Sequence, residues 1–99
     1  MPKLKRIQVD YEGEKYTLRE LTFSELGDVM KKSARVRLAG DDYQLELDVH
    51  AMQEMLLEKC IEYPKLSMQE IRDLPAGLSI TLLNECLKLT PVMSFARSK

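Results

Sequence analysis

The chain has 99 residues, of which 44% are hydrophobic, so it is long enough for one domain with a modest core. Charged residues make up 31% of the chain and balance to a formal net charge of −1 at pH 7. This balance argues against disorder, which combines low hydrophobicity with high net charge, and against a general nucleic-acid binder, which carries a basic excess. No apolar run approaches the roughly 20 residues of a membrane span, and no apolar run follows the basic residues 3–6 as in a secretory signal.

The first 20 residues predict a β-hairpin. Residues 4–11 and 15–20 each alternate between two faces, with Ile7, Val9 and Tyr11 on one face of the first strand. Glu12-Gly13-Glu14 supplies a turn whose glycine can adopt a positive φ. Because two strands alone are marginally stable in water, we expect this hairpin to pack on helices.

A helix is predicted over residues 23–33. Thr22 and Glu25 have the spacing of a capping box, in which each side chain bonds the other residue's backbone N–H. The predicted apolar face consists of Phe23, Leu26, Met30 and a further candidate, Val29. Gly27 costs about 1 kcal/mol relative to alanine inside a helix, and close backbone packing would explain its presence.

Residues 34–47 permit two interpretations. Val36 and Leu38 alternate with arginines, and residues 43–47 alternate again after a turn-like Gly40-Asp41-Asp42. A second hairpin fits the period of the pattern, and a mobile loop fits its charge, so the sequence leaves both open.

Three further helices are predicted over residues 49–62, 68–73 and 75–89. Asp48 caps the first, Tyr63-Pro64 breaks it, and Ser67 with Glu70 forms a second capping box. Pro75 suits the first turn of the last helix, and Thr90-Pro91 ends it.

The last helix has an apolar arc that covers about half its circumference, more than a simple surface helix needs. It therefore requires neighbours on two sides, or one neighbour and a partner protein. We predict that surplus apolar residues form one wall of an open protein-binding groove, namely Leu57, Ile61, Leu78, Leu82 and Leu89.

No pattern predicts a catalytic, cofactor or metal site. His50 is expected to be a surface or packing residue, and Asp41 with Asp42 lacks calcium-loop spacing. Cys60 and Cys86 are expected to be reduced core residues, with a disulfide as the minor alternative. A small basic cluster could contact nucleic acid but has no interleaved aromatic platform; its members are Lys31, Lys32, Arg35 and Arg37.

Two stretches resemble the small tail assembly chaperones of long-tailed bacteriophages (siphovirus- and myovirus-like) and prophages. The first is residues 13–26, GEKYTLRELTFSEL, and the second is residues 57–78, LEKCIEYPKLSMQEIRDLPAGL. The resemblance implies a non-enzymatic protein that binds the long helical tape measure protein, helps recruit tail tube subunits, and leaves before the tail is finished. It transfers no specific binding residue, and residues 34–47 match nothing in the family.

We therefore expect an α+β fold, an N-terminal β-hairpin packed on three to four α-helices, in one domain over residues 1–93 with a flexible tail over 94–99. The expected function is that of a tail assembly chaperone in the cytoplasm of the bacterial host, absent from the mature virion. The alternative is a structural virion component, such as a tail or head–tail connector subunit. We expect no nucleic-acid or membrane partner and leave self-association open.

Overall fold

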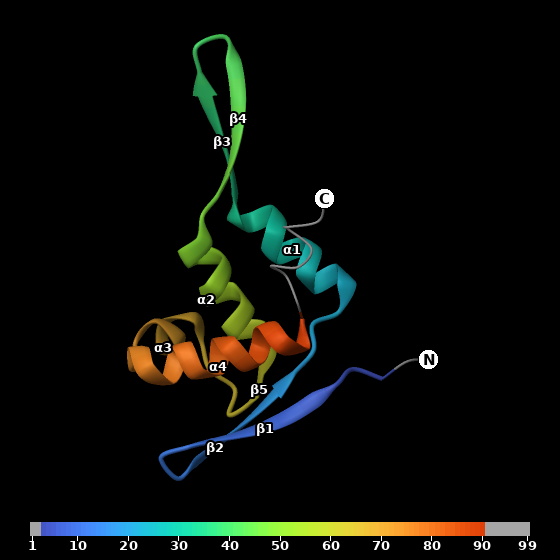
Figure 1. Ribbon diagram of the computed structural model, residues 1–99, viewed down its shortest axis with the longest axis vertical. Coiled ribbons are helices and arrows are strands. Elements are labelled where there is room, and N and C mark those ends of the chain that lie inside the picture. Colours follow the sequence, from blue (N-terminus) through green and yellow to red (C-terminus); the bar gives the residue numbers. More distant parts are fainter. Residues whose placement is uncertain (1–2, 91–99) are drawn as a thin grey trace.

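The computed structural model describes residues 3–90 and confirms the α+β fold, with helices beside an N-terminal hairpin (Figure 1). The elements are β1 (Arg6–Tyr11), β2 (Glu14–Arg19), α1 (Phe23–Ser33), β3 (Ala34–Ala39), β4 (Asp42–Leu47), α2 (Val49–Cys60), β5 (Ile61–Tyr63), α3 (Met68–Arg72) and α4 (Ala76–Leu89). The predicted tail over residues 94–99, and the domain end at residue 93, lie outside the described residues.

The N-terminal hairpin has the predicted strands and register. Ile7 pairs with Leu18 and Val9 pairs with Tyr16, which places apolar side chains of both strands on the face that packs on the helices. Glu12 and Gly13 form the turn with φ values of 51° and 86°. Both central residues therefore have positive φ, as in a type I′ turn, whose twist matches that of the flanking strands.

A third strand, β5, was missed by the sequence analysis. The sheet order is β1-β2-β5, and Ile61 pairs with Leu18. The prediction that α2 continues to residue 62 is wrong, because the helix ends at Cys60 and the chain then pairs with β2. Glu62 therefore lies on β5 and forms an ion pair with Arg6 at 2.8 Å.

Helix α1 begins with the predicted capping box. The Thr22 hydroxyl accepts a hydrogen bond from the Glu25 N–H, and the Glu25 carboxylate accepts one from the Thr22 N–H. The predicted apolar face is wrong at Phe23, which is 88% exposed, because the buried face is centred on Val29 with Leu26 and Met30 beside it. Phe23 lies about 120° around the helix from Val29 and so points to solvent.

The expectation that Gly27 permits close packing is also wrong. A Cβ atom added at Gly27 would meet nothing within 4 Å, so the glycine only weakens the helix. Gly27→Ala is therefore expected to raise the free energy of unfolding by about 0.5–1 kcal/mol, since alanine has the higher helix propensity. Urea denaturation followed by circular dichroism measures the change, and a destabilised Gly27→Ala variant would contradict it.

Helix α2 lies between α1 and α4 and also contacts α3. Asp48 caps it by accepting a hydrogen bond from the Ala51 N–H at 3.0 Å. Its buried residues, together with those of α4 and β2, form the centre of the core. The buried hydrophobic residues are Leu18, Leu21, Val29, Met52, Leu56, Leu57, Cys60, Ile61, Ile71, Leu78, Leu82 and Cys86.

Helix α4 packs against α2 and against the β1–β2 hairpin. At Gly77 it approaches β1 closely, since a Cβ atom there would lie 3.1 Å from the Tyr11 hydroxyl oxygen. Cys60 and Cys86 are both buried, as predicted, and both thiols are free. Cys60 donates to the Arg19 carbonyl at 3.2 Å, and Cys86 donates to the Leu56 carbonyl at 3.8 Å.

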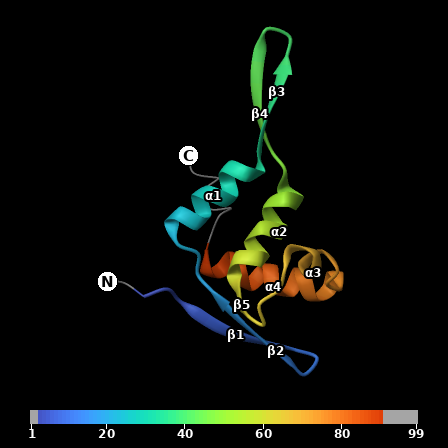
Figure 2. The same ribbon diagram turned by 180° about the vertical axis from the view of Figure 1, so that it is seen from behind.

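Residues 34–47, for which the sequence left a hairpin and a mobile loop open, form a hairpin, β3–β4. This hairpin projects away from the helices (Figures 1 and 2). Its strands join directly to the end of α1 and, through Asp48, to the start of α2. Gly40 has a φ of 65° in the turn. The protein measures 53 × 35 × 21 Å, and the hairpin extends along its longest axis.

An ion pair joins β2 to the start of α1. The Arg19 guanidinium donates two hydrogen bonds to the Glu25 carboxylate, at 2.7 and 2.6 Å, and thereby lowers the pKa of Glu25 to about 2. Because the pKa is lower in the folded protein, the pair stabilises the fold above the ordinary pKa of a glutamate, and this stabilisation is lost as the pH falls from about 4.5 towards 2.

Glu25→Gln is expected to lower the free energy of unfolding by about 1 kcal/mol at pH 7, since the pair is partly exposed to solvent. Glutamine preserves the capping box, so the change isolates the charge. The difference from the wild type should shrink as the pH falls below 4.5, when measured by urea denaturation at pH 7, 5 and 3. Glu85→Gln, which removes an exposed pair with Lys88, is the control; a difference from the wild type at Glu25 that stays constant with pH would contradict the assignment.

Candidate functional site

The five residues predicted to form an open groove do not do so. Four of them, Leu57, Ile61, Leu78 and Leu82, are buried in the core, and Leu89 is partly buried against it. Helix α4 has neighbours on two sides, α2 and the β1–β2 hairpin, which together cover its wide apolar arc. The predicted groove is therefore wrong at Leu57, Ile61, Leu78 and Leu82, because the monomer itself covers these four residues.

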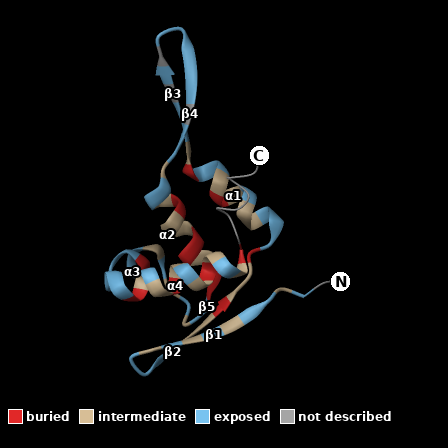
Figure 3. Ribbon diagram, viewed as in Figure 1, coloured by how far each residue is buried: buried red, intermediate tan, exposed pale blue. Residues whose placement is uncertain are grey.

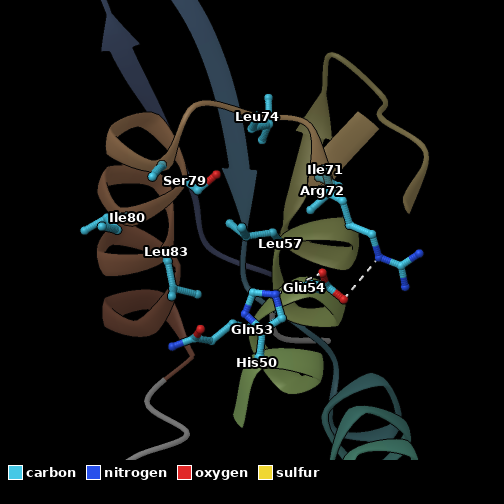
Figure 4. Close-up of a pocket in the computed structure, with 11 residues that line it drawn as sticks. His50, Gln53, Glu54, Leu57, Ile71, Arg72, Leu74, Ser79, Ile80 and Leu83 are labelled. Atoms are coloured by element: carbon cyan, nitrogen blue, oxygen red, sulfur yellow. Dashed lines mark hydrogen bonds and ion pairs between the residues drawn. The ribbon is translucent and has the colours of Figure 1, made fainter. Parts of the chain in front are cut away.

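A recess with a volume of about 270 Å³ lies between α2, α3 and α4 (Figure 4). Its apolar lining includes Leu57, Ile71, Leu74, Ile80 and Leu83. Of the five predicted groove residues, Leu57 lines this recess. The recess is slightly smaller than the range of about 300–1,000 Å³ that is usual for small-molecule sites, and it fits a single apolar side chain of a partner better than a cofactor.

The polar rim of this recess is centred on Glu54. Its carboxylate accepts from Arg72 Nε at 3.3 Å and lies 3.3 Å from Nε2 of His50 (Figure 4). His50 is a surface residue, as predicted from the sequence. Glu54 therefore lies between two basic neighbours, His50 and Arg72.

The second candidate site is the β3–β4 hairpin, which we call the arm (residues 34–47). Its register pairs Val36 with Leu45, Leu38 with Tyr43, and Ala34 with Leu47, so the apolar positions alternate onto one face. Exposure is 70% for Val36, 65% for Leu38 and 76% for Tyr43, and the arm is exposed over most of its length (Figure 3). Val36, Leu38 and Tyr43 thus form a group of exposed apolar side chains on neighbouring positions of the two strands.

The opposite face of the arm is polar and its base is fixed. Arg35 is opposite Glu46 in the register, and Arg37 is opposite Gln44. At the base, the Asp48 N–H donates to the Ser33 carbonyl at 2.8 Å, and Arg35 forms an ion pair with Asp48 at 2.6 Å. The arm is therefore a two-stranded ribbon whose base is joined to the ends of α1 and α2 by a hydrogen bond and an ion pair.

The charges near the arm offer little to an anion or a cation. Lys32 pairs with Asp28 and Arg35 pairs with Asp48, so these two members of the basic cluster noted in the sequence have acidic partners. Asp41 and Asp42 lie at the exposed turn of the arm. Over residues 3–90, no three potential ligands among histidine, cysteine, aspartate and glutamate are grouped as a metal ion would require.

Comparison with family models, with curated proteins and with solved structures gives no match for this chain. Within the described part of the chain, no helix is both long enough and apolar enough to cross a membrane. The features that bear on function are therefore the arm, the recess and the resemblance of residues 13–26 and 57–78.

Proposed function

We propose that the protein is a non-enzymatic phage tail assembly chaperone that binds the tape measure protein and helps recruit tail tube subunits. The observation that supports this proposal best is the arm, whose exposed apolar face is unusual for a monomeric protein. Contiguous exposed apolar residues with a polar surround mark protein-binding surfaces. We therefore assign client binding to the face that carries Val36, Leu38 and Tyr43.

The low stability of a lone hairpin and the small area of its apolar face suit a chaperone that must release its client. A two-stranded hairpin has little stability of its own in water, so covering its apolar face is favourable. The face is small and surrounded by charge, which supports modest affinity instead of permanent association. A long, largely helical client would present an apolar stripe to such a surface.

The two stretches that resemble the family lie on either side of the arm in the sequence, which agrees with the assignment of client binding to the arm. Residues 13–26 cover β2 and the start of α1, and residues 57–78 cover the end of α2 through the start of α4. Both stretches therefore belong to the body that carries the arm. The arm lies between them and resembles nothing in the family, as expected if the body is shared and the client-binding surface varies with the client.

The test is binding of purified tape measure fragments to a triple variant, Val36→Thr, Leu38→Thr and Tyr43→Thr. Threonine preserves strand propensity while removing the apolar face. We expect binding to weaken by about tenfold or more, which corresponds to about 1.4 kcal/mol, and the solubility gain on co-expression to be lost. The matched control is Phe23→Ser, which removes an equally exposed apolar side chain from the body. Wild-type protein that binds no fragment, or a triple variant that binds normally, would contradict the proposal.

The arm also favours a second candidate, a structural virion component such as a tail or head–tail connector subunit. A projecting hairpin can reach a neighbouring subunit in a particle and remain there. The two functions predict different locations. A chaperone acts in the host cytoplasm and is absent from purified virions, whereas a structural subunit is present in many copies when virions are analysed by mass spectrometry.

A further inference from the structure

We infer that Cys60 and Cys86 are a redox-sensitive pair, which a peroxide converts into a disulfide between the end of α2 and the last turn of α4. Both side chains are fully buried and belong to the same core cluster. Both thiols are free, so the pair is in its reduced form in this structure. The inference goes beyond the proposed function and does not depend on it.

A backbone carbonyl of α2 brings the two cysteines to the same place in the core. The Cys86 sulfur lies 3.8 Å from the carbonyl oxygen of Leu56. In an α-helix that carbonyl accepts a hydrogen bond from the N–H four residues further on, which here belongs to Cys60. Cys86 therefore contacts α2 at the turn that carries Cys60, where α2 and α4 pack together.

The two thiols differ in acidity, which decides the order of their reactions. Hydrogen bonding between them lowers the pKa of Cys60, and the backbone and charge of Arg19 lower it further. The same hydrogen bonding raises the pKa of Cys86, and burial raises it further. Because the thiolate is the reactive form of cysteine, we expect Cys60 to meet the oxidant first and Cys86 to react second.

The reaction consumes one molecule of hydrogen peroxide for each protein. The Cys60 thiolate attacks one peroxide oxygen and the O–O bond breaks, which leaves a sulfenic acid on Cys60 and releases hydroxide, which takes up the former thiol proton as water. The Cys86 sulfur then attacks the Cys60 sulfur and the S–O bond breaks. The departing hydroxide takes the thiol proton of Cys86, so two thiols are oxidised and the peroxide is reduced to two water molecules.

Burial limits the oxidants that can reach the pair. Hydrogen peroxide is close to water in size and can enter during a brief local opening of the core. A large disulfide such as oxidised glutathione would need a much wider opening. We therefore expect slow oxidation of the folded protein by the peroxide, and slower oxidation still by glutathione disulfide.

The disulfide would join two parts of the core that also support the recess. It closes a loop over residues 60–86, which contains β5, α3 and most of α4. Ile80 and Leu83 of the recess lie within this loop, whereas Leu57 lies on α2. Oxidation would therefore hold the two walls of the recess together and stabilise the fold, since a cross-link restricts the unfolded chain.

The test is to treat the folded protein with hydrogen peroxide, alkylate the remaining thiols and measure the intact mass. We expect a monomer that has lost two hydrogen atoms, carries no alkyl group and unfolds at a higher urea concentration. Dithiothreitol should reverse these changes. Thiols that stay open to alkylation while the same treatment in urea oxidises them, or sulfinic acids or a covalent dimer as the main product, would overturn the inference.

Single variants test the order of the two reactions. In Cys86→Ser the sulfenic acid on Cys60 has no second thiol to attack it, so it should accumulate and be trapped by dimedone. In Cys60→Ser the remaining Cys86 should react about tenfold or more slowly, because it is the less acidic thiol. Dimedone labelling of Cys86 that is as fast as that of Cys60 would contradict this order.

A matched control moves the second thiol by one position along α4. The double variant Cys86→Ser with Leu87→Cys rotates the thiol by about 100° around the helix axis. We expect its cross-link to Cys60 to form about tenfold or more slowly than the wild-type disulfide, because disulfides require a specific geometry. Circular dichroism before oxidation shows that the variant is folded. Equal rates of cross-linking would show that α2 and α4 do not hold the two cysteines in place, which would overturn the inference.

Discussion

Leu82→Ala is expected to lower the free energy of unfolding by about 3 kcal/mol, because it removes a fully buried side chain and leaves a cavity. Leu82 lies on the side of α4 that was expected to face a partner, together with Leu78 and Cys86, all three of which are buried. Chemical denaturation measures the loss. For a domain of this size, it would remove a large fraction of the total stability.

The matched control for this prediction is Ile80→Ala on the same helix. Ile80 is 59% exposed at the edge of the recess, so its truncation should cost less than about 1 kcal/mol. If both substitutions had equally small effects, Leu82 would not be part of the core, and the apolar side of α4 would be free for a partner after all.

Thr90→Val is expected to cost about 2 kcal/mol of stability. The buried Thr90 hydroxyl accepts a hydrogen bond from the Leu21 N–H at 3.0 Å and so joins the end of α4 to the start of α1. Valine has nearly the same shape but cannot accept, so the buried N–H would lose its partner.

Thr90→Ser retains the hydroxyl and should cost less than Thr90→Val. Thermal unfolding of the two variants separates the hydrogen bond from the lost methyl group. A serine variant that is less stable than the valine variant would show that packing, and not the hydrogen bond, gives Thr90 its effect.

Local signals in the sequence predicted most of the elements. The capping boxes at Thr22 and Ser67 placed two helix starts, and Pro75 and Thr90 marked the limits of α4. Missed features depend on contacts between distant parts of the chain. Ile61 continues the apolar stripe of α2 by spacing, but Leu18 offers it a strand partner 43 residues away, and that pairing ends the helix.

The candidate site was predicted in the wrong place for a similar reason. The sequence of α4 has more apolar residues than one buried face needs. It does not show that α2 and the β1–β2 hairpin both pack on this helix and cover those residues. The alternation of Val36, Leu38 and Tyr43 was visible, yet alternation alone does not say whether a partner element lies over the apolar side. The three-dimensional arrangement shows that Val36, Leu38 and Tyr43 are exposed among residues 3–90.

The arm has a length that the buried core does not constrain. Its strands leave and return through a closed base at Ser33 and Asp48, and none of its side chains that the structure describes belongs to the buried core. Two residues added to each strand would lengthen it by about 6.6 Å and would keep every side chain on its original side of the ribbon. Insertions and deletions in matched pairs would therefore tune its reach without altering the fold that supports it.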